Sequence, residues 1–128
     1  MKLDILIVED DITSQNLFSI VLNPLSNNLY VVDNGIDAIE TFKNNHIDLI
    51  LMDIRLNGIN GIETTTMIRE ISKDVIIIGQ SAYILNEEIL KFKQAGTTHF
   101  LTKPINLKIL INIIKKYFPN LELKPPID

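Results

Sequence analysis

The feature that most constrains the fold of this chain is a regular alternation of short apolar segments with longer amphipathic ones. The apolar segments are rich in Ile, Val and Leu and four to six residues long, which is typical of strands buried on both faces of a parallel sheet. They occupy Leu3–Val8, Leu29–Val32, Leu49–Met52, Val75–Gly79 and His99–Thr102. Segments of helical length follow them at Ile12–Leu25, Gly35–Asn44, Gly61–Ser72, Leu85–Ala95 and Leu107–Phe118. The sequence therefore predicts a βα unit repeated five times.

Five successive βα units predict an α/β fold in which helices cover both faces of a parallel sheet. We expect the flavodoxin-like form, a doubly wound five-stranded sheet in the order 2-1-3-4-5. The length of 128 residues is that of one domain. We place this domain at residues 1–120 and interpret residues 121–128, which contain Pro125 and Pro126, as a C-terminal tail or linker remnant.

Composition excludes several classes of function. The chain has no cysteine, which excludes disulfide scaffolds, thiol catalysis and cysteine-ligated metals. Its net charge of −4 argues against direct nucleic-acid binding, which usually needs a basic surface. No apolar segment has the roughly 18 residues of a membrane span, and the N-terminus lacks the pattern of a signal peptide. We therefore expect a cytoplasmic protein that binds neither membranes nor nucleic acid.

Polar side chains come at or just after the ends of four of the predicted strands. Glu9, Asp10 and Asp11 follow the first strand, and the third, fourth and fifth are followed by Asp53, Ser81 and Lys103. Since ligands of such sheets bind beyond the carboxyl ends of the strands, we expect these residues to meet at one edge. Clustered carboxylates repel one another unless a proton or a cation intervenes, and a donor set of oxygens alone favours Mg²⁺. Asp11 is interpreted mainly as a helix cap.

Asp53 is the candidate for covalent chemistry. It directly follows a buried strand, which presents a single carboxylate in a fixed position. Such a carboxylate, beside Mg²⁺ and an ammonium group, can act as a nucleophile toward phosphorus. Lys103 and the Ser81 hydroxyl are suitable donors to the phosphoryl oxygens, and Asp10 and Asp53 would hold the cation.

Several sequence pieces together resemble the receiver domain of two-component response regulators, the CheY-like superfamily, over nearly the whole chain. The pieces are Ile5–Asp11, Leu51–Ile54 with Gly61 downstream, Ile76–Ala82, and Ala95-Gly96 leading into Phe100–Pro104. Intervals of 43, 28 and 22 residues separate Asp10, Asp53, Ser81 and Lys103. Each piece alone is weak, but together, in this order and spacing, they are specific.

The resemblance implies a role for each matching residue. Asp53 would be the phosphoacceptor, and Lys103 would pair with its phosphoryl group. Asp10 would ligate Mg²⁺ directly, Glu9 would hold it through water, and the backbone carbonyl of Arg55 would complete the protein ligands.

The resemblance also implies a conformational switch. Ser81 would move toward the phosphoryl oxygen, Phe100 would swing inward with it, and Pro104 would follow a cis peptide bond. Arg55 and Tyr83 occupy the two positions that flank the path of attacking water in the family. Because both side chains are bulky, we expect slow loss of phosphate.

The same residues also have ordinary structural interpretations. Glu9–Asp11 alone is compatible with a solvated turn, Asp53 or Ser81 alone with a turn residue, and Phe100 with plain core. The loop after Asp53 departs from the family pattern, with Leu56-Asn57 and Asn60-Gly61 in place of Met-Pro and Asp-Gly. None of these departures removes a catalytic group, so we expect an active receiver.

The last helix carries more apolar residues than one buried face needs. A core stripe is predicted at Leu107, Leu110, Ile111, Ile114 and Phe118. Ile109 and Ile113 fall nearly opposite this stripe and are expected to be exposed, as part of a partner surface. In the family, dimers or output domains dock in this region. His46 and His99 are expected at surface or turn positions.

The leading hypothesis is a switch that takes a phosphoryl group from the phosphohistidine of a histidine kinase or phosphotransfer domain. It would be no enzyme beyond catalysing its own phosphotransfer and dephosphorylation. The chain would be either a stand-alone regulator or the receiver of a hybrid sensor kinase. The alternatives are a flavodoxin-like cofactor binder, an aspartyl-nucleophile phosphatase, and a receiver that no longer takes phosphate. The acids Glu9–Asp11 oppose the first, Arg55 in place of a second acid or base opposes the second, and the complete residue set opposes the third.

Overall fold

The structure, a computed structural model, describes residues 1–82 and 85–122. In this part of the chain five strands alternate with five α-helices. The strands are β1 (Leu3–Val8), β2 (Ser26–Val32), β3 (Leu49–Asp53), β4 (Ile76–Ser81) and β5 (His99–Thr102). The helices are α1 (Ile12–Leu22), α2 (Gly35–Asn44), α3 (Gly61–Ile71), α4 (Asn86–Ala95) and α5 (Leu107–Tyr117), with a 3₁₀ turn, η1, at Asn23–Leu25. Tyr83, one of the two residues expected beside the path of water, lies outside the described residues.

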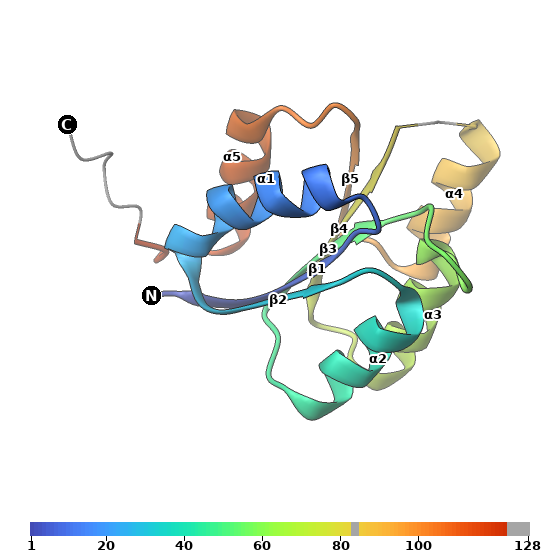
Figure 1. The fold of residues 1–128 in the computed structure, drawn as a ribbon, viewed down its shortest axis with the longest axis horizontal. Coiled ribbons are helices and arrows are strands. Elements are labelled where there is room, and N and C mark those ends of the chain that lie inside the picture. The colour runs from blue at the N-terminus through green and yellow to red at the C-terminus, as the bar shows by residue number, and fades with distance from the viewer. Residues whose placement is uncertain (83–84, 123–128) are drawn as a thin grey trace.

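The five strands form one parallel sheet in the order β2-β1-β3-β4-β5, which confirms the predicted fold (Figure 1). The register pairs Val8 with Met52 and Asp53 with Gln80. Ser81 is paired in turn with Thr102. The central strands therefore end nearly level, which brings the residues that follow them to one edge of the sheet.

Two element boundaries differ by three residues from the sequence prediction, and the others agree with it to within two residues. Helix α1 ends at Leu22 rather than Leu25, because Pro24 has no N–H to continue the helix and its ring crowds the preceding turn. The chain forms the turn η1 there instead. Strand β2 starts at Ser26 rather than Leu29, because its polar first residues pair with the start of β1, where Leu3 is opposite Ser26.

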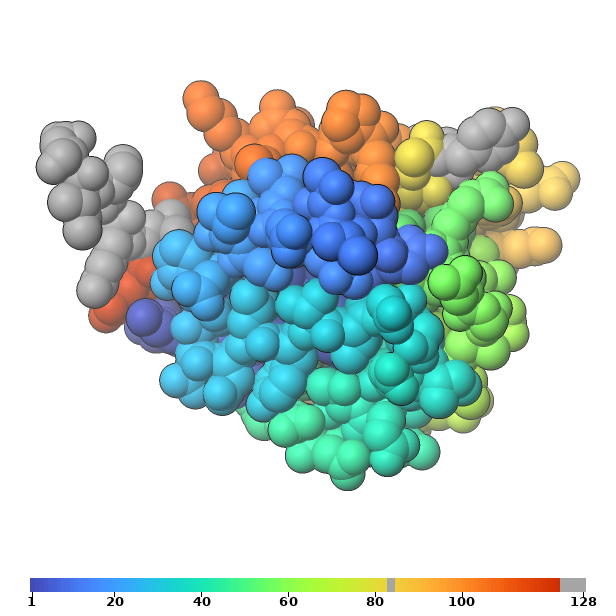
Figure 2. Space-filling view, in the orientation of Figure 1, coloured from blue at the N-terminus to red at the C-terminus, as the bar shows by residue number. Residues whose placement is uncertain are grey.

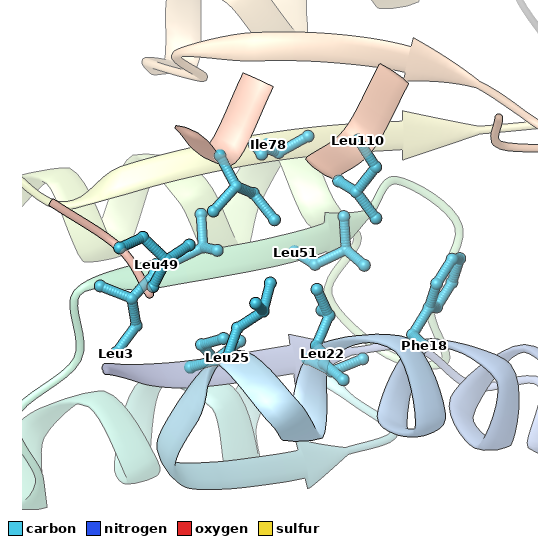
Figure 3. Close-up of a cluster of buried hydrophobic side chains, with 12 residues drawn as sticks. Leu3, Phe18, Leu22, Leu25, Leu49, Leu51, Ile78 and Leu110 are labelled. Atoms are coloured by element: carbon cyan, nitrogen blue, oxygen red, sulfur yellow. The ribbon is translucent and has the colours of Figure 1, made fainter. Parts of the chain in front are cut away.

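The sheet separates two hydrophobic cores. On one face, odd-numbered residues of β1 and β3 pack against α1 and α5, as Figure 3 shows for Leu3, Leu51, Leu22 and Leu110. On the other face, the even-numbered residues pack against α2, α3 and α4. Leu121, at the start of the expected tail, belongs to the first core. Burial on both faces is the reason that the strands are continuously apolar.

Local signals in the sequence begin and end the helices. Asp11, Asn34, Asn60 and Asn106 are N-caps whose side chains accept hydrogen bonds from backbone N–H groups of the first turn. The interpretation of Asp11 as a cap is thereby confirmed. Gly96 ends α4 with a φ of 118°, a left-handed conformation that favours glycine.

Helix α5 buries the predicted stripe, but one of the two residues expected opposite it also packs inward. Its fully buried residues are Leu110 and Ile114, and Ile113 is half-buried against the same core. The expectation that Ile113 is exposed is therefore wrong, whereas Ile109 is 49% exposed. The reason is that the core stripe is centred on Leu110 and Ile114, which leaves Ile113 at its flank.

His99 is likewise half-buried rather than at the surface, because it lies in β5 and its ring packs edge-on against Tyr117. No helix in the described part of the chain combines the length and the apolar character needed to span a bilayer.

Candidate functional site

Three carboxylates meet where β1 and β3 end. Glu9 directly follows β1 and is fully buried, and Asp53 ends β3 and is 4% exposed, whereas Asp10 is open to solvent. One carboxylate oxygen from each of the three lies within 4.8 Å of the others. The convergence follows from the register, because Val8 and Met52 are paired in neighbouring strands.

Lys103 supplies the positive charge of this cluster. Its Nζ lies 2.6 Å from Glu9 Oε1 and 3.2 Å from Asp53 Oδ2. Its backbone N–H donates to the carbonyl of Ser81, which ties the end of β5 to the end of β4. The Lys103–Pro104 peptide bond that follows is cis. The ammonium group therefore bridges two buried carboxylates.

The electrostatics of the cluster shift three ionisable groups. Burial, and then a hydrogen-bonding contact with Asp53, raises the pKa of Glu9. Burial and the neighbouring charge of Glu9 raise the pKa of Asp10. Burial alone would lower the pKa of Lys103, but its contacts with Glu9 and Asp53 outweigh this effect and raise it. The three carboxylates of the site thus carry more negative charge than the single ammonium group of Lys103 can neutralise.

Backbone and amide contacts hold the two acidic loops in place. The Gln15 side chain donates from Nε2 to the carbonyl of Glu9 at 2.6 Å, which ties α1 to the end of β1. The backbone N–H of Arg55 donates to Asp53 Oδ1 at 3.3 Å. The Arg55 guanidinium reaches Glu88 of α4, with Nη2 3.1 Å from Oε1. These contacts orient the loops that carry the acidic groups.

Helix α3 approaches the end of β3 closely enough to require glycine. A Cβ on Gly61 would lie 2.0 Å from the carbonyl oxygen of Asp53, a distance no side chain tolerates. The N–H of Gly61 also donates to the carbonyl of Ile54 at 2.8 Å. Gly61 thereby closes the loop that carries Arg55 back against the strand.

The two residues expected to act as a switch lie on the neighbouring strands β4 and β5. Ser81 is buried at the end of β4. Phe100 is half-buried in β5 and packs edge-on against Phe92 of α4, with 5.8 Å between ring centroids. Phe92 in turn covers Gly79, where a Cβ would lie 2.5 Å from its ring. Phe100 is therefore in contact with α4.

The structure brings together Glu9, Asp10, Asp53 and Lys103, with Ser81 and Arg55 adjoining them through backbone contacts. Ile109 lies elsewhere, on the exposed side of α5. Sequence reasoning missed three contributors. The first is Gln80, which could have been noticed in the sequence because it is a polar residue at the end of an apolar strand. The others are Gln15, which holds Glu9, and Glu88, which pairs with Arg55, and nothing in the sequence indicates these two contacts.

A second cluster lies at the opposite end of the sheet. His46 places Nδ1 2.9 Å from Asp4 Oδ2 and Nε2 3.5 Å from Asp48 Oδ1. The hydrogen bond to Asp4 raises the pKa of His46, and the same contact lowers the pKa of Asp4. We interpret this cluster as a surface ion-pair network.

The donor set of the acidic cluster fits a hard divalent cation. Glu9, Asp10 and Asp53 offer only oxygen atoms, and two of them have pKa values raised by burial and mutual repulsion, which a cation would relieve. Mg²⁺ is commonly bound by one or two carboxylates together with waters and phosphate oxygens. The residues present therefore suit Mg²⁺.

Comparisons with known proteins agree with this geometry. The family model described as response regulator receiver domain matches residues 5–115. Two-component response regulator 24 of Arabidopsis thaliana is 33% identical over 116 residues, covering 90% of this chain and 84% of that protein. Hybrid signal transduction histidine kinase B of Dictyostelium discoideum is 35% identical over 127 residues, covering 88% of this chain but 6% of the kinase. The chain spans less than a fifth of several such relatives.

A solved structure shows the same fold. The receiver domain of a sensor histidine kinase from Pseudomonas aeruginosa PAO1, with a magnesium ion coordinated in its active site cleft, has a TM-score of 0.84 and 30% identity. The match covers 93% of this chain and 99% of that one. This chain therefore belongs to the response regulator receiver domain family, the CheY-like signalling modules of two-component systems that occur in response regulators and hybrid histidine kinases.

Proposed function

We propose that the protein is a phosphorylation-operated switch that accepts a phosphoryl group on Asp53. The donor is the phosphohistidine of a histidine kinase or of a phosphotransfer domain. The observation that carries the proposal is the buried Asp53 carboxylate, with Lys103 Nζ at 3.2 Å and the carboxylates of Glu9 and Asp10 beside it. We place this function in the cytoplasm, in a stand-alone regulator or in the receiver of a hybrid kinase.

In the transfer, an oxygen of Asp53 forms a bond to phosphorus while the bond from phosphorus to the donor histidine nitrogen breaks. The Lys103 ammonium, already 3.2 Å from Asp53 Oδ2, pairs with the phosphoryl oxygens as they arrive. Asp10, Asp53 and the backbone carbonyl of Arg55 would hold Mg²⁺ directly, and Glu9 would hold it through water. When bound, the cation neutralises charge that develops on the phosphoryl oxygens.

The phosphorylated state then differs at the α4-β5-α5 face. The Ser81 hydroxyl turns toward a phosphoryl oxygen, and Phe100, which packs against Phe92, changes its packing with it. A hollow of about 710 Å³ lies on this face, lined by Ile89, Lys93 and residues 97–102. Together with exposed Leu90 and Ile109, this hollow supports docking of a second copy or an output domain on the face.

A second surface supports approach of the phosphodonor. Helix α1, blue in Figure 2, forms part of the face toward the viewer, and its Leu17 is 46% exposed. An apolar hollow of about 340 Å³, lined by Leu17, Phe18, Lys103, Pro104 and Ile105 among others, lies between α1 and the loop after β5. Because Lys103 lines both this hollow and the acidic cluster, a donor domain docked here would have its phosphohistidine near Asp53.

The test is phosphorylation by a small donor. The native chain is incubated with acetyl phosphate and Mg²⁺, and its intact mass is measured, alongside Asp53→Asn and the control Asp74→Asn, which changes an exposed acid outside the cluster. We expect the native chain and the control to gain the mass of one phosphoryl group and Asp53→Asn to gain none. Omission of Mg²⁺ should abolish the gain. A phosphorylated Asp53→Asn protein, or a native chain that gains no mass, would refute the proposal.

A further inference from the structure

One ion pair links the loop after the phosphoacceptor to helix α4. Arg55 lies two residues beyond Asp53, and its backbone N–H donates to Asp53 Oδ1 at 3.3 Å. In its side chain, Nη2 lies 3.1 Å and 3.3 Å from the two carboxylate oxygens of Glu88, in the first turn of α4. The guanidinium nearest the acceptor is therefore held by a competing anion.

We propose that Glu88 is a positioning residue, which acts through Arg55 to set the lifetime of the phosphoryl group and the link between the site and α4. This inference rests on the proposed function of Asp53. In the unphosphorylated protein Glu88 keeps the guanidinium on α4. In the phosphorylated protein the phosphoryl group and Glu88 compete for it.

Exposure and charge favour the phosphoryl group over Glu88 in the competition for the Arg55 guanidinium. The side chains of Arg55 and Glu88 are 58% and 28% exposed, so solvent and salt screen their attraction and the pair is weak. A phosphoryl group carries more charge than a carboxylate and offers three oxygens that match the two-pronged donor geometry of arginine. Because the Arg55 backbone already touches Asp53, a group on that carboxylate is within reach of an extended arginine side chain.

Movement of Arg55 has two consequences. The link between the loop after β3 and the first turn of α4 is lost, which frees the helix that Phe100 contacts through Phe92. The guanidinium also covers the phosphoryl oxygens. Hydrolysis forms a bond from a water oxygen to phosphorus and breaks the bond from phosphorus to Asp53, releasing inorganic phosphate and a proton. Arg55 at the phosphoryl group obstructs the approach of that water, so a weaker hold by Glu88 means slower hydrolysis.

The experiment is a double-mutant cycle on loss of aspartyl phosphate. The native chain, Glu88→Gln, Arg55→Ala and the double variant are phosphorylated with acetyl phosphate, the donor is removed, and the phosphorylated fraction is followed by intact mass. We expect Glu88→Gln to lengthen the half-life about three- to fivefold, the range available to an exposed ion pair. Arg55→Ala should shorten the half-life, and adding Glu88→Gln to it should change nothing further.

Two controls separate this role from a general charge effect. Glu87→Gln removes the same charge from the neighbouring position in α4 and should leave the half-life unchanged. Glu88→Asp keeps the charge and should restore most of the native half-life. Hydrogen exchange of the first turn of α4 gives a readout that does not depend on hydrolysis. Exchange should quicken when beryllofluoride is bound to the native chain, and should already be quick in unphosphorylated Glu88→Gln.

The outcomes are distinguishable. If phosphorylated native chain and Glu88→Gln have equal half-lives, or if Glu88→Gln has the same effect without Arg55, this inference fails while the proposed function stands. If the native chain takes no phosphoryl group, the proposed function fails and the inference fails with it.

Discussion

At the scale of single residues, the acidic cluster is defined by how each charge is compensated. Glu9 is fully buried, and Lys103 lies 2.6 Å from it. Because an unpaired buried carboxylate costs several kcal/mol of stability, Glu9 can be buried only with this partner. Lys103 lies nearer to Glu9 than to Asp53. Glu9 therefore holds the lysine in place, while Asp53 contacts the lysine through Oδ2 and accepts a hydrogen bond from the Arg55 N–H through Oδ1.

Gln80 is a buried polar residue whose side chain finds no compensating contact in the described part of the chain. Its side chain leaves the sheet on the same face as Asp53, because the two are paired in register. It is fully buried, and neither its amide oxygen nor its amide nitrogen has a hydrogen-bond partner among the described residues. Buried polar atoms without partners cost about 1–3 kcal/mol.

Replacing Gln80 with an apolar residue of similar size should therefore stabilise the protein. We expect Gln80→Leu to raise the free energy of unfolding by about 1 kcal/mol, measured by urea denaturation. Gln15→Leu is the matched control, because the Gln15 amide does have a partner, the carbonyl of Glu9. This control should be destabilised. A Gln80→Leu protein less stable than the native chain would contradict the prediction.

At the scale of elements, the candidate site depends on how closely α3 approaches β3. The sequence shows a helix beginning near Gly61, and the structure adds that only glycine permits its position, because a Cβ there would collide with the carbonyl of Asp53. The same contact closes the loop that carries Arg55. The first turn of α3 and the end of β3, which carries Asp53, therefore pack together as one unit.

Gly61→Ala should disturb this unit. Overpacking against a backbone carbonyl should lower the free energy of unfolding by about 1–3 kcal/mol and slow phosphorylation of Asp53, since α3 or the strand end must move. Urea denaturation and the phosphorylation assay test the two effects. Gly58→Ala is the control: Gly58 has open space around it but a φ of 77°, so its cost is one of backbone conformation alone, about 1 kcal/mol. A smaller loss for Gly61→Ala than for Gly58→Ala would contradict this explanation.

A strand or helix can be predicted from the sequence where a single local pattern of residues determines it. All five strands and helices were anticipated, because buried parallel strands are apolar runs and Asp11, Gly96 and Asn106 act within their own turns. The position of Ile113 was not, because several apolar residues of α5 compete for one buried stripe. Helical periodicity indicated Leu110 and Ile114 correctly, whereas only packing against the core places Ile113 inward.

At the scale of the whole molecule, the negative charges at the two ends of the sheet are compensated in different ways. The site end buries carboxylates against Lys103, whereas the opposite end places Asp4 and Asp48 on either side of His46. With a net charge of −4, both arrangements affect how stability varies with pH. The second depends on a histidine, a side chain whose charge ordinarily changes near neutral pH.

Stability should fall as His46 loses its proton. Its pKa is raised in the folded protein by the hydrogen bond to Asp4, so its stabilising contribution is complete below the ordinary value of 6.5 and disappears as the pH rises through the raised value. The pKa of Asp4 is lowered, so its part is lost only on acidification through that lower value. Urea denaturation at about pH 5 and about pH 8 should show a larger loss for the native chain than for His46→Gln. His99→Gln, which leaves this cluster intact, should behave like the native chain; equal losses in all three proteins would contradict the assignment.

The sequence by itself determined the class of fold and which residues face one another at the site. A strand buried on both faces is recognisable in the sequence because its consecutive residues are apolar. Parallel strands that end level bring the residues at their ends, here Glu9, Asp10, Asp53 and Lys103, to one edge of the sheet. Only the tertiary structure decided that Glu88 holds Arg55 across 33 residues, that the buried Gln80 amide has no hydrogen-bond partner within residues 1–82 and 85–122, and that Ile113 packs inward. These features arise from packing between elements distant in the chain, where several side chains compete for one position and local patterns do not select among them.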